Sequence, residues 1–350
     1  MELSQRQEFN PIGFTFSFKE FDGRPTNVSE QKDAQEFLND LFDRLEKALK
    51  PTSRKYLLES IFQGKQCSQL LCPECGKVKN RIEDMLNLSL TVKDIKSVYD
   101  SLEAQIKGEV ISGYKCEGCN KEVDIKKRSL IAETPNVLIV HMQRILFNFD
   151  SLQNEKENQW FEFPYQLDLK PYSYHEVMKT EATEIKKDDA EYVEPAEEDC
   201  FEYKLVGVTF HSGSANAGHY WSYINTARGQ DEKPGSDPSW PETEKDPWME
   251  FNDSTVRDYN FDKLKDECYG DKKESKTSHT LGGWGMDTKY GKSGYMLFYE
   301  RKVKKPIKIV IPKADVANHT DLHYDAKAEE HIKLIDYRQG VDNEKPNQIF

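Results

Sequence analysis

The sequence predicts an α+β protein, and three observations carry that prediction. Apolar residues recur at helical spacing between residues 34 and 49, which indicates a long amphipathic helix near the start. Runs rich in β-branched and aromatic residues, at 134–141, 203–211 and 219–224, indicate strands further along. Two Cys-x-x-Cys pairs lie between the helix and these strands. Together they describe a helical start, a cysteine-bearing middle and a strand-rich remainder.

Composition narrows the class of protein. At 350 residues the chain can bury a sizeable core and hold one large or two ordinary domains. No run is long enough to span a bilayer, and residues 1–7 lack the apolar core of a signal peptide. The formal charge of −13 argues against a nucleic-acid partner and suits a basic one. We therefore expect neither a nucleic acid nor a membrane as partner, and nothing indicates an oligomer.

The helix near the start has recognisable ends. Ser29 offers an N-cap, with Glu30 and Asp33 in the first turn, and Pro51 follows the last turn. Periodicity alone supports only an ordinary amphipathic core helix.

The four paired cysteines predict a metal site. They occur as Cys72-x-x-Cys75 and Cys116-x-x-Cys119, each followed at once by turn-forming residues. Two such knuckles bring four thiolates to one tetrahedral Zn²⁺ site, which would be structural because no ligand position stays open. A redox pair is the alternative for either motif alone. The long stretch between the two motifs has to leave the metal site and return to it, which predicts intervening strands with a helix near residues 99–106. Cys67 is expected to be a strand residue. An odd number of cysteines, seven, with four in metal-binding pairs indicates metal binding and not a disulfide framework. This is typical of a protein of the cytoplasm or nucleus.

A histidine at the mouth of a hairpin is the candidate catalytic residue. The strand at 203–211 leads into a small-residue loop at 212–218, and a second strand opens at His219. A lone histidine in a strand is usually structural. Asn252 and Asp253, which open another turn, change that reading, because a histidine oriented by an amide or carboxylate is two-thirds of a nucleophilic triad.

Four segments are expected to lie outside the strand motifs. Residues 173–200 carry ten acidic residues against three lysines and predict a solvated, partly disordered insertion. Residues 229–248 and 270–294 read as loop insertions. After residue 301 we expect one more strand or a docked linker at 305–312, and then a polar tail with a helical tendency at 326–335.

These motifs together resemble the ubiquitin-specific protease family of cysteine deubiquitinases, over roughly residues 14–172 and 201–301. The resemblance rests on the order and spacing of Gln31-x-Asp-Ala-x-Glu-Phe37, Gly218-His-Tyr220, Trp248-x-x-Phe-Asn-Asp-x-x-Val256 and Tyr295-Met-Leu-Phe-Tyr299. It implies a papain-like fold with a thumb, a palm and zinc-bearing fingers. The implied division is a thumb remnant at 1–60, fingers and first palm strands at 61–172, the acidic insertion at 173–200, palm at 201–301 and a tail at 302–350.

The resemblance also implies roles for individual residues in hydrolysis of the bond after the C-terminal glycine of ubiquitin. His219 would act as general base and then general acid, Asn252 would accept its Nδ1–H, and Asp253 would reinforce this. Asp33 and Gln35 would face the tail of ubiquitin. Gly218 would let that tail approach, and Tyr220 and Tyr223 would lie near its channel. Ubiquitin and ubiquitinated proteins are the expected partners.

The nucleophile is the role that no residue fills. In the family a cysteine well before the Gln-x-Asp-Ala-x-Glu-Phe helix attacks, and this chain has none there. Cys67, Cys200 and Cys268 lack the setting of a reactive thiol. We therefore expect the N-terminal part of the thumb to be missing and the chain to be part of a longer enzyme. The alternatives are an inactive ubiquitin-binding pseudoenzyme and a zinc-dependent scaffold unrelated to ubiquitin.

Overall fold

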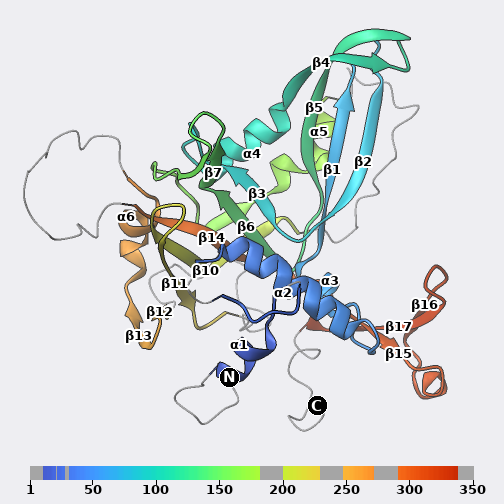
Figure 1. Ribbon diagram of the computed structural model, residues 1–350. Coiled ribbons are helices and arrows are strands. Elements are labelled where there is room, and N and C mark those ends of the chain that lie inside the picture. The colour runs from blue at the N-terminus through green and yellow to red at the C-terminus, as the bar shows by residue number, and fades with distance from the viewer. Residues whose placement is uncertain are drawn as a thin grey trace, which may run out of the picture.

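A central sheet organises the molecule, and a second sheet projects from it (Figure 1). The computed structural model describes residues 11–20, 22–27, 31–181, 200–228, 247–271 and 291–337. The mixture of helices and sheets agrees with the predicted α+β class. No helix among these residues is long and apolar enough to cross a membrane.

The central sheet, which we call the palm sheet, has eight strands. Its order is β13 (Thr255–Tyr259), β12 (Trp248–Asn252), β11 (Gly218–Asn225), β10 (Glu202–Gly213), β14 (Lys292–Arg301), β6 (Val137–Gln143) and β3 (Leu88–Thr91), with β9 (Gln166–Asp168) also pairing with β10. Neighbours are antiparallel except β3 and β6. The strands expected from β-branched and aromatic runs are therefore confirmed, as β6, β10 and β11.

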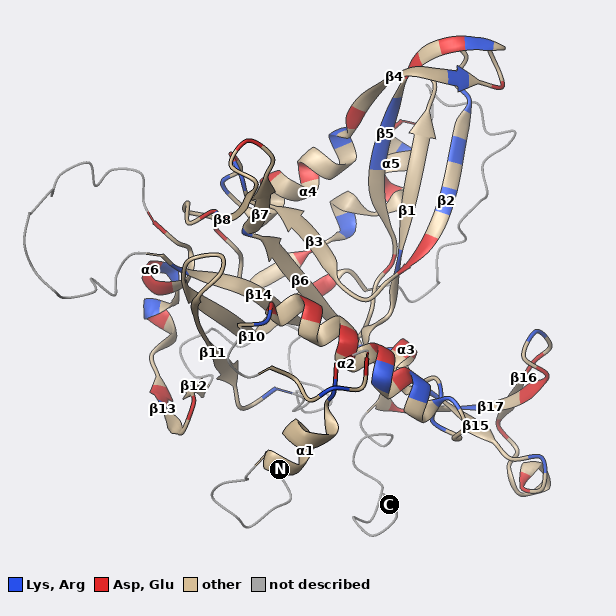
Figure 2. Cartoon of the chain, viewed as in Figure 1, with Lys and Arg blue, Asp and Glu red and all other residues tan. Residues whose placement is uncertain are grey.

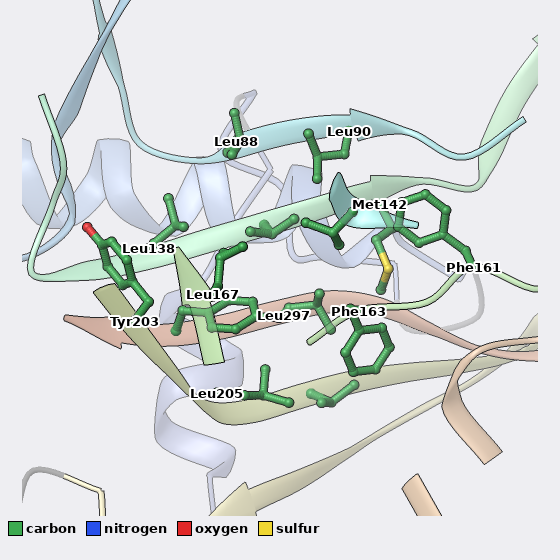
Figure 3. Close-up of a cluster of buried hydrophobic side chains, with 14 of the residues drawn as sticks. Leu88, Leu90, Leu138, Met142, Phe161, Phe163, Leu167, Tyr203, Leu205 and Leu297 are labelled. Atoms are coloured by element: carbon green, nitrogen blue, oxygen red, sulfur yellow. The ribbon is translucent and has the colours of Figure 1, made fainter. Parts of the chain in front are cut away.

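The largest apolar cluster covers one face of the palm sheet. Figure 3 shows side chains from β3, β6, β10 and β14 meeting those of the segment that carries Phe161 and Phe163. Leu90, Phe161, Leu205 and Leu297 are completely buried. Each such side chain contributes roughly 1.5–3 kcal/mol on burial, so this cluster holds the sheet in place.

The projecting sheet, which we call the fingers sheet, has four antiparallel strands. Its order is β2 (Val78–Met85), β1 (Gly64–Leu71), β5 (Lys121–Glu133) and β4 (Glu109–Cys116). Cys67 lies in β1 and is fully buried, as expected of a strand residue. The predicted helix in the excursion is α4 (Val98–Lys107), which Ser97 caps through its hydroxyl and Gly108 ends at φ +69°.

A buried polar network attaches a helix to the back of the fingers sheet. Arg128 donates to Gln69 at 2.7 Å and to both carboxylate oxygens of Glu181 at 2.7 and 2.8 Å. Asn80 continues the network from Gln69 to Tyr174. These contacts hold α5 (Tyr174–Thr180). The prediction of a solvated insertion from residue 173 was wrong for this first part, because buried Tyr174 and Val177 anchor it; residues 182–199 lie outside the described residues.

The amphipathic helix is α2 (Ala34–Leu49), and it lies across the palm sheet (Figure 1). Phe42 is buried with Ile139, Tyr295 and Met296. Charged residues occupy the outer surface of α2 (Figure 2), and Lys47 pairs with Asp43 at 2.5 Å. The predicted cap was wrong: Ser29 lies outside the described residues, and Asp33 caps the helix by accepting from the backbone N–H groups of Gln35 and Glu36.

The segment after residue 301 folds into a small sheet. Its first strand agrees with the strand alternative for residues 305–312, whereas the polar tail expected after them was wrong. The strands of this sheet are β15 (Ile307–Ile311), β17 (Glu330–Ile335) and β16 (Leu322–Asp325), and they project at one end of the molecule (Figure 1). The predicted helical tendency at 326–335 was wrong, because alternating Ile332 and Leu334 belong to β17. The backbone N–H of Val310 donates to Ser53, which attaches this sheet to the segment after α2.

The remaining elements are short. They are α1 (Ile12–Ser17), α3 (Leu57–Phe62), the hairpin of β7 (Ile145–Asn148) and β8 (Gln153–Lys156), α6 (Leu264–Cys268), and 3-10 turns at Lys170–Tyr172, Phe261–Lys263 and Val316–Asn318. The two predicted loop insertions fall mainly on residues 229–246 and 272–290, which are outside the described residues.

Candidate functional site

The candidate site lies where β10 turns into β11. The strands pair as far as Gly213 and Gly218, so the connection is only residues 214–217, shorter than the predicted loop. It is closed by the Ser214 N–H, which donates to the Ala217 carbonyl at 2.8 Å. A Cβ on Gly218 would lie 2.1 Å from the Ser212 carbonyl oxygen and 2.5 Å from His211 Nε2. Glycine is therefore required here by packing within the hairpin; its role in a substrate channel stays a prediction.

His219 and Asn252 meet, as predicted. The two are on adjacent strands, and Nε2 of His219 lies 2.7 Å from Oδ1 of Asn252. Asp253, at the β12–β13 turn with φ +50°, places a carboxylate oxygen 3.7 Å from the same nitrogen. The ring of Trp221 stacks on the imidazole at 5.6 Å. The side chain of His219 is 45% exposed, so it is open to a reactant.

One detail of the triad prediction was wrong. We expected Nδ1 of His219 to face Asn252, and the structure presents Nε2 instead. An amide oxygen accepts only, so Nε2 carries the proton in the neutral ring. Nδ1 then has the lone pair and no hydrogen-bond partner among the described residues. That nitrogen is the one free to take a proton.

Asp33, Tyr220 and Tyr295 form a second group beside the hairpin. Tyr295 donates its hydroxyl to Oδ2 of Asp33, whose Oδ1 caps α2. Tyr220 packs against Tyr295 with ring centroids 5.7 Å apart. Burial raises the pKa of both tyrosines, and the Asp33 charge adds to this effect. Asp33 thus has a structural role whether or not it also meets a substrate.

His211 links these two groups. It is fully buried under Gly218, its ring packs at a tilt against Tyr220 with centroids 4.5 Å apart, and its Nε2 lies 3.0 Å from the amide nitrogen of Gln31. Burial lowers the pKa of His211 to about 4, and the nearby ammonium of Lys156 acts in the same direction. The ring is therefore neutral at physiological pH.

Gln35 and Tyr223 make their hydrogen bonds with residues other than His219. The backbone N–H of Gln35 donates to Asp33 in the first turn of α2. Tyr223 is buried, donates to Glu267 at 2.9 Å and stacks on Tyr259 at 3.7 Å. The roles that the resemblance gives to both residues stay predictions.

Two residues near the site were missed by sequence reasoning. Lys156 donates to the carbonyl oxygens of His211 and Gly291, and burial lowers its pKa to about 7. A single lysine in a polar hairpin gives no sequence signal. Glu250, two residues before Asn252, lies on the same face of β12, which strand alternation alone could have indicated.

The four paired cysteines come together at the far end of the fingers sheet. Their sulfur atoms lie within 4.8 Å of one another, with Cys72–Cys119 at 3.6 Å and Cys75–Cys116 at 3.7 Å. Four sulfurs at about 2.3 Å from one ion would be about 3.8 Å apart, so the cluster fits a tetrahedral metal. The turns after each pair use Gly76 and Asn120 at positive φ.

The protonation of this cluster also suits a cation. The backbone N–H of Cys119 is the main cause that lowers the pKa of Cys116 to about 7. The pKa of Cys119 rises to about 12, mainly through its hydrogen bond with Cys75. The opposite directions show that these crowded thiols titrate together, and a metal ion would displace their protons.

None of the seven cysteines, all of which are described, contacts His219. Four belong to the cluster, Cys67 and Cys268 are buried, and Cys200 is half-buried near Glu202. Burial raises the pKa of the Cys268 thiol well above its usual value. The prediction that the chain lacks a placed nucleophile is consistent with these positions.

Comparison with known proteins points to one family. The family model described as ubiquitin carboxyl-terminal hydrolase matches residues 1–299. The chain is 33% identical over 314 residues to ubiquitin carboxyl-terminal hydrolase 9X of Mus musculus, which covers 86% of this chain and 12% of that protein. It is 32% identical over 304 residues to ubiquitin carboxyl-terminal hydrolase 34 of Homo sapiens, covering 85% and 8%. The chain therefore spans only a small part of these relatives.

A solved structure gives the same fold. It is that of the SAGA Ubp8/Sgf11/Sus1/Sgf73 DUB module bound to ubiquitin aldehyde, with a TM-score of 0.54 and 24% identity, covering 78% of this chain and 50% of that chain. At this identity the likeness shows the fold, which is the papain-like one predicted.

Proposed function

The chain belongs to the ubiquitin carboxyl-terminal hydrolase family, and on that premise we propose that it supplies the base and the ubiquitin-binding surface of a thiol-dependent deubiquitinase. The observation that carries the proposal is the exposed His219–Asn252 pair at 2.7 Å. None of the seven cysteines lies at that pair, so the proposal requires an attacking cysteine that this structure does not place there.

The chemistry assigned to His219 follows from its two nitrogens. Nδ1 accepts the proton of the thiol, and the thiolate attacks the carbonyl carbon of the C-terminal glycine of ubiquitin. Asn252 and Asp253 stabilise the imidazolium that results. Nδ1–H then protonates the leaving lysine amine, and a water activated by the same nitrogen hydrolyses the thioester.

We assign Zn²⁺ to the cysteine cluster at the tip of the fingers. Cys72, Cys75, Cys116 and Cys119 would hold the ion, and four thiolates leave no position for a substrate, so the role is structural. The need to keep these thiols reduced supports the cytoplasm or nucleus as location.

Ubiquitin is the partner that tests the proposal. Titration of labelled ubiquitin into this chain should give saturable binding, and Asp33→Ala should weaken it. Ubiquitin with a thiol-reactive C-terminus should not label the chain. A chain extended by upstream coding sequence that supplies a cysteine should label, and His219→Ala should greatly slow its turnover.

The outcomes separate the candidate functions. Binding without labelling of any extended chain supports an inactive ubiquitin-binding protein, which the absence of a thiol at His219 favours. No binding of ubiquitin by any form of the chain contradicts both. Specific labelling of Cys67, Cys200 or Cys268 would show that the nucleophile lies within this chain.

A further inference from the structure

Glu250 is a buried carboxylate beside the candidate triad. It is 5% exposed and lies on β12 two residues before Asn252, so both side chains are on one face of the strand. Arg257, its cross-strand partner on β13, donates from Nε and from Nη2 to Oε2 of Glu250, each at 2.8 Å. Arg257 compensates the buried charge and leaves Oε1 for another donor.

That donor is the amide of Asn252. Its Nδ2 lies 3.4 Å from Oε1 of Glu250, a long hydrogen bond, while its Oδ1 lies 2.7 Å from Nε2 of His219. The two ends of an amide differ, because Nδ2 only donates and Oδ1 only accepts. Turning the amide over would set its oxygen against a carboxylate oxygen. The carboxylate thus selects the orientation in which the amide oxygen faces the imidazole.

We propose that Glu250, held by Arg257, is a positioning residue that fixes the amide of Asn252 and through it the tautomer of His219. With the amide oxygen toward Nε2, the ring is protonated there and Nδ1 is the base. Its catalytic meaning rests on the proposed function. Glu250 occupies an unspecified position of the Trp248-x-x-Phe251-Asn252-Asp253 motif, so the device belongs to this chain and not to the motif.

The tautomer can be measured on the chain itself. Histidine-selective ¹⁵N labelling yields signals from eight residues, and the His219→Gln variant identifies those of His219. Two-bond ¹H–¹⁵N spectra at a pH where the ring is neutral report which nitrogen carries the proton. We expect mainly Nε2–H in the wild type. In Glu250→Gln the ratio of Nε2–H to Nδ1–H should fall about three- to tenfold, because a Gln amide accepts either orientation of Asn252.

The control is Asp258→Asn. It removes a carboxylate charge from the residue next to Arg257 on β13, where the side chain is exposed. It should leave the ratio unchanged. Arg257→Gln, which frees the carboxylate, should give a smaller shift in the same direction as Glu250→Gln.

Two results would overturn the proposal. One is an unchanged ratio in folded Glu250→Gln. The other is Nδ1–H as the main form in the wild type, which decides the matter even if the variants do not fold. Neither readout needs ubiquitin or a thiol. A failure of ubiquitin binding would therefore contradict the proposed function without affecting this result.

Discussion

The tip of the fingers sheet and the end of the palm sheet where β11 begins and β12 ends, which we call the palm edge, both present chemically active side chains, but they are held in opposite ways. At the tip two of the four residues in the buried cluster are ligands themselves, Cys72 and Cys116, beside Val123 and Ile125. At the palm edge His219 and Asn252 are attached to a sheet that a far larger apolar cluster already stabilises. The same side chains that would bind metal are therefore the core of the tip, whereas the palm edge keeps its fold without the pair.

Metal removal should give the largest effect. We expect chelation, or Cys72→Ser, to unfold the fingers tip locally, because structural Zn²⁺ in small domains contributes about 10 kcal/mol or more. Metal content should fall from one Zn²⁺ per chain to none. Amide hydrogen exchange is the measurement, with protection lost in β4 and the outer part of β5 but kept in β10 and β14. Protein purified in reducing buffer without chelator and found free of metal would contradict the assignment.

Substitution of Arg128 tests whether the fingers sheet, like the palm sheet, depends on its buried contacts for stability. Arg128→Met should destabilise the protein by about 3 kcal/mol, since it leaves the Glu181 carboxylate without its cation and Oε1 of Gln69 without its donor. Lys127→Met on the exposed side of the same strand is the matched control, and its change should stay below about 1 kcal/mol. Urea midpoints of the two variants compare them directly. Equal effects would show that the buried pair contributes nothing beyond an exposed one.

His211 predicts a pH dependence centred on the palm. Its folded-state pKa of about 4 lies below the ordinary 6.5, so the unfolded chain takes up a proton that the folded chain does not. Stability is then full above pH 6.5 and falls as the pH drops toward 4. At about 1.4 kcal/mol per pKa unit, this residue accounts for about 2 kcal/mol between pH 7 and pH 5. Denaturation of wild type and His211→Gln at both pH values measures it; an identical pH dependence would refute the assignment.

The triad pair should give the smallest effect on stability. His219→Ala changes a half-exposed side chain and should alter the free energy of unfolding by about 0.5 kcal/mol or less. Asn252→Ala should cost somewhat more, because it removes a donor to the buried carboxylate of Glu250. Gly218→Ala is the contrast within the same hairpin, because its Cβ would collide with the Ser212 carbonyl. Thermal unfolding of the three variants ranks them. A large loss in His219→Ala would mean that the edge, like the tip, depends on its functional residues.

Sequence reasoning succeeded where the relevant signal was local or carried by a motif. The cysteine pairs, helix α2, strands β10 and β11 and the pairing of His219 with Asn252 were all predictable. Asp33 could have been recognised as the helix cap from local rules, but its other partner, Tyr295, is remote in sequence. The helix after Ser173 was missed because its contacts through buried Arg128 and Tyr174, and not its local composition, determine that it folds. The ring nitrogen that faces Asn252 depends on hydrogen-bond geometry that no pattern encodes.

The strand order of the palm sheet has a consequence for the order of folding. β14, the last strand of that sheet in the chain, lies between β10 and β6. The hairpin that carries His219 can pair locally, but the sheet cannot close until residues 292–301 arrive. On a ribosome, the fingers can therefore fold early, while the palm waits for a contact of long sequence separation, which is slow to form. We expect the half-closed sheet, with β6 and β10 unpaired along one edge, to be the state most in need of a chaperone.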